Sequence, residues 1–112
     1  MKSGLKMKKY IGNGEGGRVL DIIEYLVCNY DKVYAKIVEL PSYVILEGRN
    51  SGSDFYTIIT LNDKDLETMG IGTEVIVGGS DRRDRLFRLS HDVWVHESNE
   101  RGKVTVFFYV RR

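Results

Sequence analysis

Several residue types that would point to a class of protein are scarce or missing in this chain. Its 112 residues include no glutamine, one proline and one cysteine, Cys28. A single cysteine cannot form an internal disulfide or an all-cysteine zinc site, and it is typical of a reducing compartment. No apolar stretch has the length of a transmembrane helix or the flanks of a signal peptide. We therefore expect a cytoplasmic protein without a membrane partner.

A strong excess of charge of either sign is also missing. Lysine and arginine number 17 against 16 acidic residues, which gives a net charge of +1. This balance excludes the global basic field of many nucleic-acid-binding proteins, so such a partner must be met by a local patch. Cations cluster at both ends of the chain, and the middle is acidic by difference. Abundant charge without glutamine is also a tendency of thermophilic proteins.

The length of the chain limits its organisation. A chain of 112 residues buries roughly two thirds of its unfolded surface, enough for one core and too little for a multi-domain enzyme. Its content of 42% hydrophobic and 29% charged residues is typical of a folded globule. We expect a basic N-terminal arm over residues 1–11 and a single globular domain over residues 12–112.

Hydrophobic spacing predicts a helix near the N-terminus and strands after it. Apolar side chains recur at helical intervals from Arg18 to Tyr30. After Asn29 the period changes to about two, and β-branched and aromatic residues dominate. Only one segment interrupts the strands, a short helix that Asn62 can cap. The predicted strands are residues 32–40, 43–49, 54–61, 74–78, 85–89, 93–97 and 103–110.

These elements predict an α+β fold, in which one N-terminal helix packs on a mainly antiparallel sheet of six to seven strands. Short loops force neighbouring strands to pair antiparallel. Closure into a small curled barrel would hide the edges that a flat sheet exposes. The last predicted strand is apolar on both faces. It is therefore expected in the core or beneath a partner, such as a second copy of the chain.

A glycine-rich run, Gly12-x-Gly14-x-x-Gly17, opens the predicted helix. In a dinucleotide-binding unit such a run brings pyrophosphate to the helix N-terminus, and a later acid such as Glu39 holds the ribose. Here the preceding segment is too polar for a buried parallel strand, and Glu15 would face the phosphates. A nucleotide-binding protein is kept as an alternative function, and no cofactor is assigned.

A strand, a short helix, a glycine turn and an apolar strand follow one another over residues 61–77. This order resembles the half-motif of AbrB-like swapped-hairpin regulators and of related cradle-loop barrels, with Gly72-Thr73 where those families usually have a Gly-Asp pair. The resemblance implies a DNA-binding barrel. The sequence departs from it because the DNA-binding face of that family is basic, whereas this short helix is acidic at Asp63, Asp65 and Glu67.

Basic residues supply the candidate binding site. Arginine forks suit phosphate or carboxylate recognition, although alternating charge in a hairpin loop is also typical of a solvated tip. Aromatic residues beside the C-terminal cations would suit stacking on single-stranded nucleic acid. The candidate nucleic-acid-binding residues are Lys6, Lys8, Lys9, Arg82, Arg83, Arg85, Arg88, Arg101, Lys103 and Arg111.

The sequence offers no catalytic constellation. His91 and His96 lie five residues apart across a predicted strand, which places them on opposite faces and disfavours joint metal ligation. We expect both to be surface or half-buried histidines, and Cys28 to be a small core residue of the helix. We therefore expect no metal site and no enzymatic activity.

The sequence as a whole favours a small non-enzymatic binding module. The first hypothesis is that it contacts DNA or RNA through its basic ends and through an arginine loop, namely Arg82, Arg83, Arg85 and Arg88. The second is a protein-interaction or oligomeric accessory subunit, for example a homodimer, that uses the aromatic C-terminal strand. The third is a nucleotide-binding protein that uses the glycine run.

Overall fold

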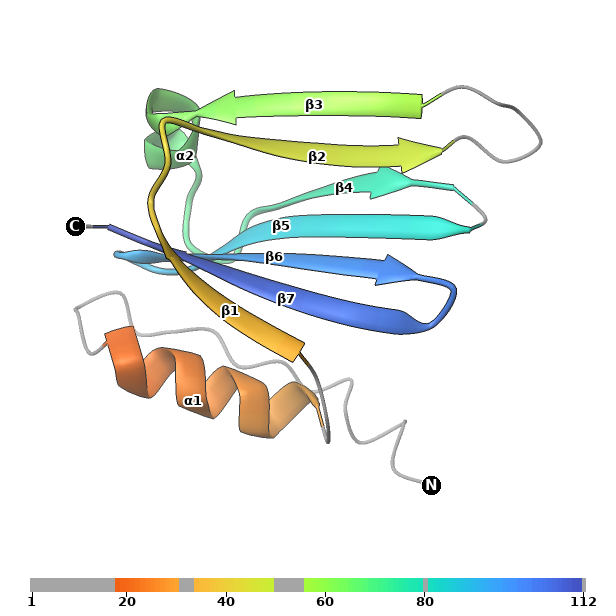
Figure 1. The fold of residues 1–112 in the computed structure, drawn as a ribbon. Coiled ribbons are helices and arrows are strands. Elements are labelled where there is room, and N and C mark those ends of the chain that lie inside the picture. Colours follow the sequence, from red (N-terminus) through yellow and green to blue (C-terminus); the bar gives the residue numbers. More distant parts are fainter. Residues whose placement is uncertain (1–17, 31–33, 50–55, 80, 112) are drawn as a thin grey trace.

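Two helices and seven strands make up the described part of the chain. The computed structural model describes all residues except 1–17, 31–33, 50–55, 80 and 112. The expected basic arm and the glycine run therefore lie outside the described residues. In chain order the elements are α1 (Arg18–Asn29), β1 (Tyr34–Glu39), β2 (Tyr43–Arg49), β3 (Tyr56–Asn62), α2 (Asp63–Thr68), β4 (Glu74–Gly78), β5 (Arg82–Ser90), β6 (Val93–Glu100) and β7 (Lys103–Val110) (Figure 1).

The strands pair into two sheets. The larger has five strands in the order β1-β7-β6-β5-β4, and β2 and β3 form a separate antiparallel hairpin. Within the larger sheet only β1 and β7 pair in parallel. The predicted α+β class with mainly antiparallel strands is thus confirmed. The curled barrel is not seen among the described strands, because β1 and β4 remain as two edges of the larger sheet.

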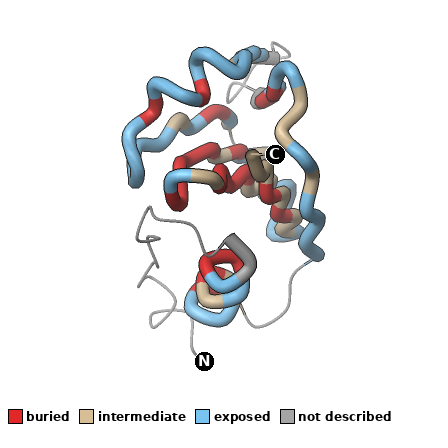
Figure 2. Tube along the Cα trace, turned by 90° about the vertical axis from the view of Figure 1, so that its left-hand side faces the viewer, coloured by how far each residue is buried: buried red, intermediate tan, exposed pale blue. Residues whose placement is uncertain are grey.

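The larger sheet is covered on both faces. On one, called here the helix face, α1 packs Tyr25 against residues such as Phe108. On the other, the hairpin face, Leu46 of β2 and Leu66 of α2 join a cluster around Trp94. Figure 2 shows the buried positions concentrated in the strands between α1 and the hairpin. Because successive side chains of a strand point to opposite faces, each central strand contributes to both clusters.

The short helix α2 begins as the sequence predicts. The side chain of Asn62 accepts a hydrogen bond from the backbone N–H of Asp65 at 2.9 Å, and the Asp65 carboxylate accepts one in return from the N–H of Asn62 at 3.3 Å. This reciprocal capping satisfies two backbone donors that the helix itself leaves open. It ends β3 and places Leu66 in the core.

The last strand lies inside the larger sheet. β7 pairs with β6 on one side and with β1 on the other, from Tyr34 beside Thr105 to Glu39 beside Val110. Val106 on its helix face is fully buried. The predicted core position of this doubly apolar strand is confirmed. Both edges of β7 are occupied, so the partner strand of the second hypothesis would have to pair elsewhere.

Candidate functional site

The structure separates the ten predicted basic site residues into three groups. Lys6, Lys8 and Lys9 lie outside the described residues. Four of the others make side-chain contacts within the chain, namely Arg82, Arg85, Arg88 and Arg111. Three are exposed, namely Arg83, Arg101 and Lys103. The ten residues therefore do not form one exposed patch.

Arg88 is buried on the hairpin face, with 7% of its surface exposed. Its guanidinium lies over the Trp94 ring, 4.7 Å from the centroid. Burial lowers the pKa of this side chain. It donates hydrogen bonds of 2.6 to 3.2 Å to the backbone oxygens of Glu67, Met69, Ser90 and His91. Arg88 thus fastens the end of α2 to the turn between β5 and β6, and its donors point inward.

Arg85 belongs to a partly buried network on the helix face. Its Nε donates to Glu97 at 2.7 Å, and its Nη2 donates to the Tyr25 hydroxyl at 3.1 Å. That hydroxyl in turn donates to Glu97, and Arg85 also pairs with Glu74 at 3.3 Å. Burial, with the neighbouring Glu97 carboxylate, raises the pKa of Tyr25. The network connects α1 to β4, β5 and β6.

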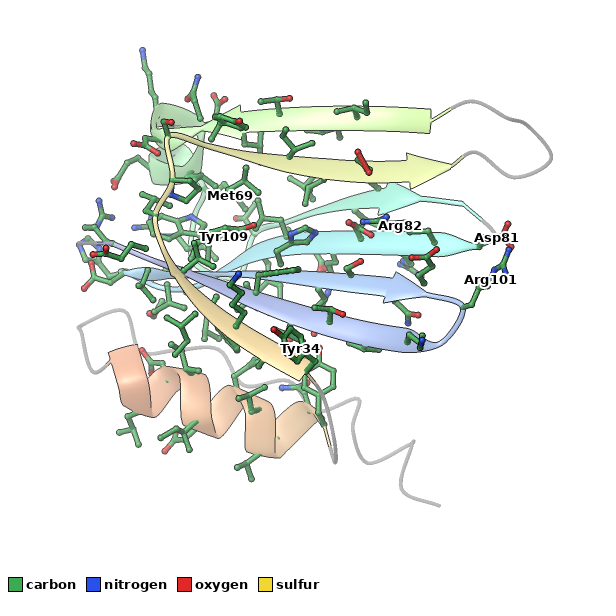
Figure 3. All side chains as sticks on the ribbon, viewed as in Figure 1. Tyr34, Met69, Asp81, Arg82, Arg101 and Tyr109 are labelled. Atoms are coloured by element: carbon green, nitrogen blue, oxygen red, sulfur yellow. The ribbon has the colours of Figure 1, made fainter. Side chains whose placement is uncertain are left out.

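Arg111 lies at the end of the sheet that carries α2. Its Nε donates to Asp92 at 3.0 Å, its Nη1 pairs with Glu67, and its guanidinium lies over the Trp94 ring at 5.4 Å. The β6–β7 turn, which carries Arg101, is at the opposite end (Figures 1 and 3). Arg111 therefore does not share one surface with Arg82, Arg83 and Arg101.

The three exposed cations gather at the end of the larger sheet where the β4–β5 and β6–β7 turns meet, called here the turn end. The backbone N–H of Arg101 donates to the Asp81 oxygen at 3.0 Å, which joins the two turns. Arg101 and Gly102 have positive φ angles of 53° and 85°, as a tight two-residue hairpin turn requires. Figure 3 shows Asp81, Arg82 and Arg101 together at this end. Acidic side chains lie among the cations, so the excess of positive charge is small.

A second buried ionic cluster lies on the hairpin face and was missed by sequence reasoning. Asp84 is fully buried, and it accepts hydrogen bonds from Arg82 Nε at 3.0 Å and Nη2 at 3.3 Å. His96 Nε2 lies 3.0 Å from Oδ2, the oxygen that also accepts from Arg82 Nη2, and the His96 ring stacks near that of Tyr109. Burial alone would raise the pKa of Asp84, but the hydrogen bonds from His96 and Arg82 lower it below its ordinary value.

Two expectations from the sequence are wrong at this level of detail. His96 is buried, with 6% of its surface exposed, because the β5–β6 register brings Asp84 diagonally beside it. Cys28 is exposed on α1. The buried side of that helix runs through Ile22, Tyr25 and Asn29, and residue 28 falls beside this line.

Large apolar side chains form a different kind of surface. On the outer side of α1, Leu20, Ile23 and Val27 are 58%, 51% and 76% exposed. Their spacing of three and four residues places them on one side of the helix, opposite Tyr25. On the edge strand β1, Tyr34 and Ile37 are 66% and 59% exposed. The molecule thus presents an apolar helix surface and an apolar sheet edge.

Among the described residues, no group of three or more histidine, cysteine, aspartate or glutamate side chains is placed to hold a metal ion. No described helix is long and apolar enough to cross a bilayer. Both oxygens of the buried Asp84 carboxylate already accept hydrogen bonds within the chain. Comparisons of the chain with family models, with curated proteins and with solved structures find no match.

Proposed function

We propose that this protein is a non-enzymatic interaction module that works as an oligomer, with a second copy of the chain bound along β1. The supporting observation is the state of this edge strand. It exposes Tyr34 and Ile37, and none of the described strands pairs with its outer edge. Natural sheets cover or blunt such edges because unpaired backbone groups and apolar side chains invite another strand. Burying one large aliphatic side chain contributes about 1.5 to 3 kcal/mol.

The chemistry of β1 favours a second copy as the occupant. The strand carries one cation, Lys36, and one anion, Glu39, so two copies of it do not repel each other through net charge. Pairing between identical edges is isologous, and it closes once two copies have met. The opposite edge, β4, is less available because the β2–β3 hairpin lies next to it (Figure 1).

The mass of the protein in solution tests this proposal. Analytical ultracentrifugation of the full chain should give twice the monomer mass of 12.9 kDa at micromolar concentration. Ile37→Lys should weaken dimerisation at least tenfold. Ile23→Lys is the matched control, because it places the same charge at an exposed isoleucine on the outer side of α1. A monomer at all concentrations, or a dimer that only Ile23→Lys disrupts, would contradict the proposal.

A second candidate function is nucleic-acid binding at the turn end of the larger sheet. The observation that favours it is the gathering of exposed Arg83, Arg101 and Lys103 where two turns meet. Cations on loops suit contacts to phosphates, and three such contacts give a weak, local interaction. Arg82, which pairs with Asp84, and Arg88, whose donors point inward, would take no part in it.

Salt dependence tests this second candidate. With three phosphate contacts, binding of a single-stranded oligonucleotide should weaken roughly twentyfold between 50 and 200 mM salt. The double substitution of Arg83 and Arg101 to alanine should remove most of the affinity. Lys64→Ala is the control, because Lys64 is an exposed cation on α2. The absence of binding at low salt would exclude this candidate.

A further inference from the structure

We infer that the two copies pair antiparallel along β1, around a twofold axis that passes between their Ile37 residues. This arrangement rests on the proposed self-association and adds its symmetry and register. It would join two five-stranded sheets edge to edge into one continuous sheet. The outer sides of both α1 helices would stay outside the contact.

The two faces of the sheet restrict the possible registers. Ala35, Ile37 and Glu39 share the helix face of the sheet, because Ile37 lies beside Phe108 in the parallel ladder. Tyr34 and Lys36 share the hairpin face. A twofold axis perpendicular to the sheet keeps each face on its own side, so residues opposite each other must belong to the same face. Odd-numbered residues of one copy therefore meet odd-numbered residues of the other.

Charge selects between the two registers nearest the middle of the strand. β1 runs from Tyr34 to Glu39, so its midpoint lies between Lys36 and Ile37. A register centred on Lys36 would place two lysines directly opposite each other, and like charges at opposed positions are destabilising. The register centred on Ile37 places two exposed isoleucines together instead.

The remaining pairs of the Ile37-centred register are compatible. Lys36 faces the second copy's Val38, Glu39 faces the second copy's Ala35, and Tyr34 faces the second copy's Leu40. No two like charges are opposed, and every residue of β1 has an opposite residue. Aromatic and aliphatic neighbours of this kind stabilise antiparallel pairs by about 0.2 to 1 kcal/mol each.

The next register towards the C-terminal end fits less well. Centred on Val38, it places Ala35 opposite Pro41, which has no backbone N–H to donate. It also places the apolar Ile37 opposite Glu39. The opposed lysines disfavour the Lys36-centred register, and Pro41 disfavours the Val38-centred one. The Ile37-centred register is therefore favoured.

Disulfide cross-linking tests the register directly. In a Cys28→Ser background, which removes the single native thiol, cysteine is placed in turn at Lys36, Ile37 and Val38. In the inferred register the two copies of residue 37 have Cα atoms about 4.5 to 5.5 Å apart, within disulfide reach. Residues 36 and 38 would each be about 8 Å from their own copy, which is too far. Ile37→Cys should therefore cross-link at least tenfold faster than the other two.

A second pair of variants tests the same register without altering Ile37. Ala35→Cys and Glu39→Cys are both exposed positions on the helix face. A mixture of the two variants should form a cross-linked heterodimer, and neither alone should cross-link. These variants keep the test decisive if Ile37→Cys itself weakens the dimer.

The possible outcomes separate the two proposals. Fastest cross-linking through Lys36→Cys or Val38→Cys would overturn the register and leave self-association through β1 intact. A dimer that resists Ile37→Lys and cross-links at none of these positions would overturn both. Fastest cross-linking through Ile37→Cys, with a cross-linked mixture of Ala35→Cys and Glu39→Cys, supports both.

Discussion

The two faces of the larger sheet each contain a buried ionic network, and the two networks fasten different parts of the molecule. On the helix face, Arg85 and Glu97 hold the Tyr25 hydroxyl and so attach α1. On the hairpin face, Arg88 attaches α2 through backbone oxygens, and Asp84 is enclosed by its own strand and by β6. Alternation along one charged strand, β5, divides its side chains into two sets of internal contacts. Little of its charge is left for a partner.

The two networks also differ in the group that titrates. On the helix face the titrating group is the Tyr25 phenol, whose pKa is raised mainly by burial. The hairpin face contains an ionised carboxylate whose pKa is lowered by its hydrogen-bond partners against the effect of burial. The first contribution to stability should fail in alkali and the second in acid.

Replacing Arg88 should have the largest effect on stability. Arg88→Met keeps much of the side-chain volume but leaves several buried backbone oxygens without donors, because Arg88 contacts four of them. We expect a loss of about 3 to 5 kcal/mol in the free energy of unfolding, measured by urea denaturation. Arg83→Met, at an exposed position of the same strand, should change it by less than about 0.5 kcal/mol. Equal effects of the two substitutions would contradict the assigned roles.

Asp84→Asn should weaken the hairpin face and change its response to acid. Because the folded-state pKa of Asp84 lies below the ordinary value of 3.8, its contribution is complete above that value and is lost as the pH falls below it. The variant should lose about 2 kcal/mol near neutral pH and show a shallower decline of stability between pH 5 and pH 2. Parallel curves for the variant and the wild type would show that this carboxylate does not drive the acid response.

Tyr25→Phe should weaken the helix face by about 1 to 2 kcal/mol, because it removes only the hydroxyl that Arg85 and Glu97 bind. The pKa of Tyr25 is raised, so its contribution is complete below the ordinary value of 10.0 and is lost as the pH rises above it. The variant should therefore lose less stability between pH 9 and pH 11. Burial and the Asp84 charge also raise the pKa of Tyr109, so Tyr109→Phe is the comparison for the other face.

The exposed side chain of Cys28 on α1 should show the smallest effect. Cys28 is exposed, so Cys28→Ser should change the free energy of unfolding by less than about 0.5 kcal/mol. The native thiol should react with a disulfide reagent at the rate of an unfolded control. Strong protection of this thiol in the folded protein would show that the flank of α1 around Cys28 is covered.

Local pattern predicted the kind of each element and much of its extent. The helix beginning at Arg18, the cap at Asn62 and all seven strands follow from apolar spacing and turn residues. The pairing of β1 with β7 could not be predicted in this way, because it joins segments about seventy residues apart. Periodicity describes neighbours along the chain, and it does not say which strand of a sheet comes next to which.

Local pattern also could not predict which basic side chains are paired within the fold. Arg83 and Arg85 point to the same face, yet only Arg85 meets Glu97, opposite it across the β5–β6 hairpin. The burial of His96 similarly depends on where that hairpin turns. Charge counting could find these side chains, but only the register decides which are neutralised and which remain exposed.

The central position of β7 has a consequence for how the protein is made. β7 comes last among the described strands in chain order, but it occupies an interior position in the larger sheet, and β1 has no other described strand to pair with. The N-terminal helix and its strand must therefore wait for residues 103–110 before they can reach their final places. The larger sheet can be completed only once residues 103–110 have been synthesised, and β1 is open to other chains until then. Loss of these eight residues would leave β1 unpaired and uncover the core beneath α1.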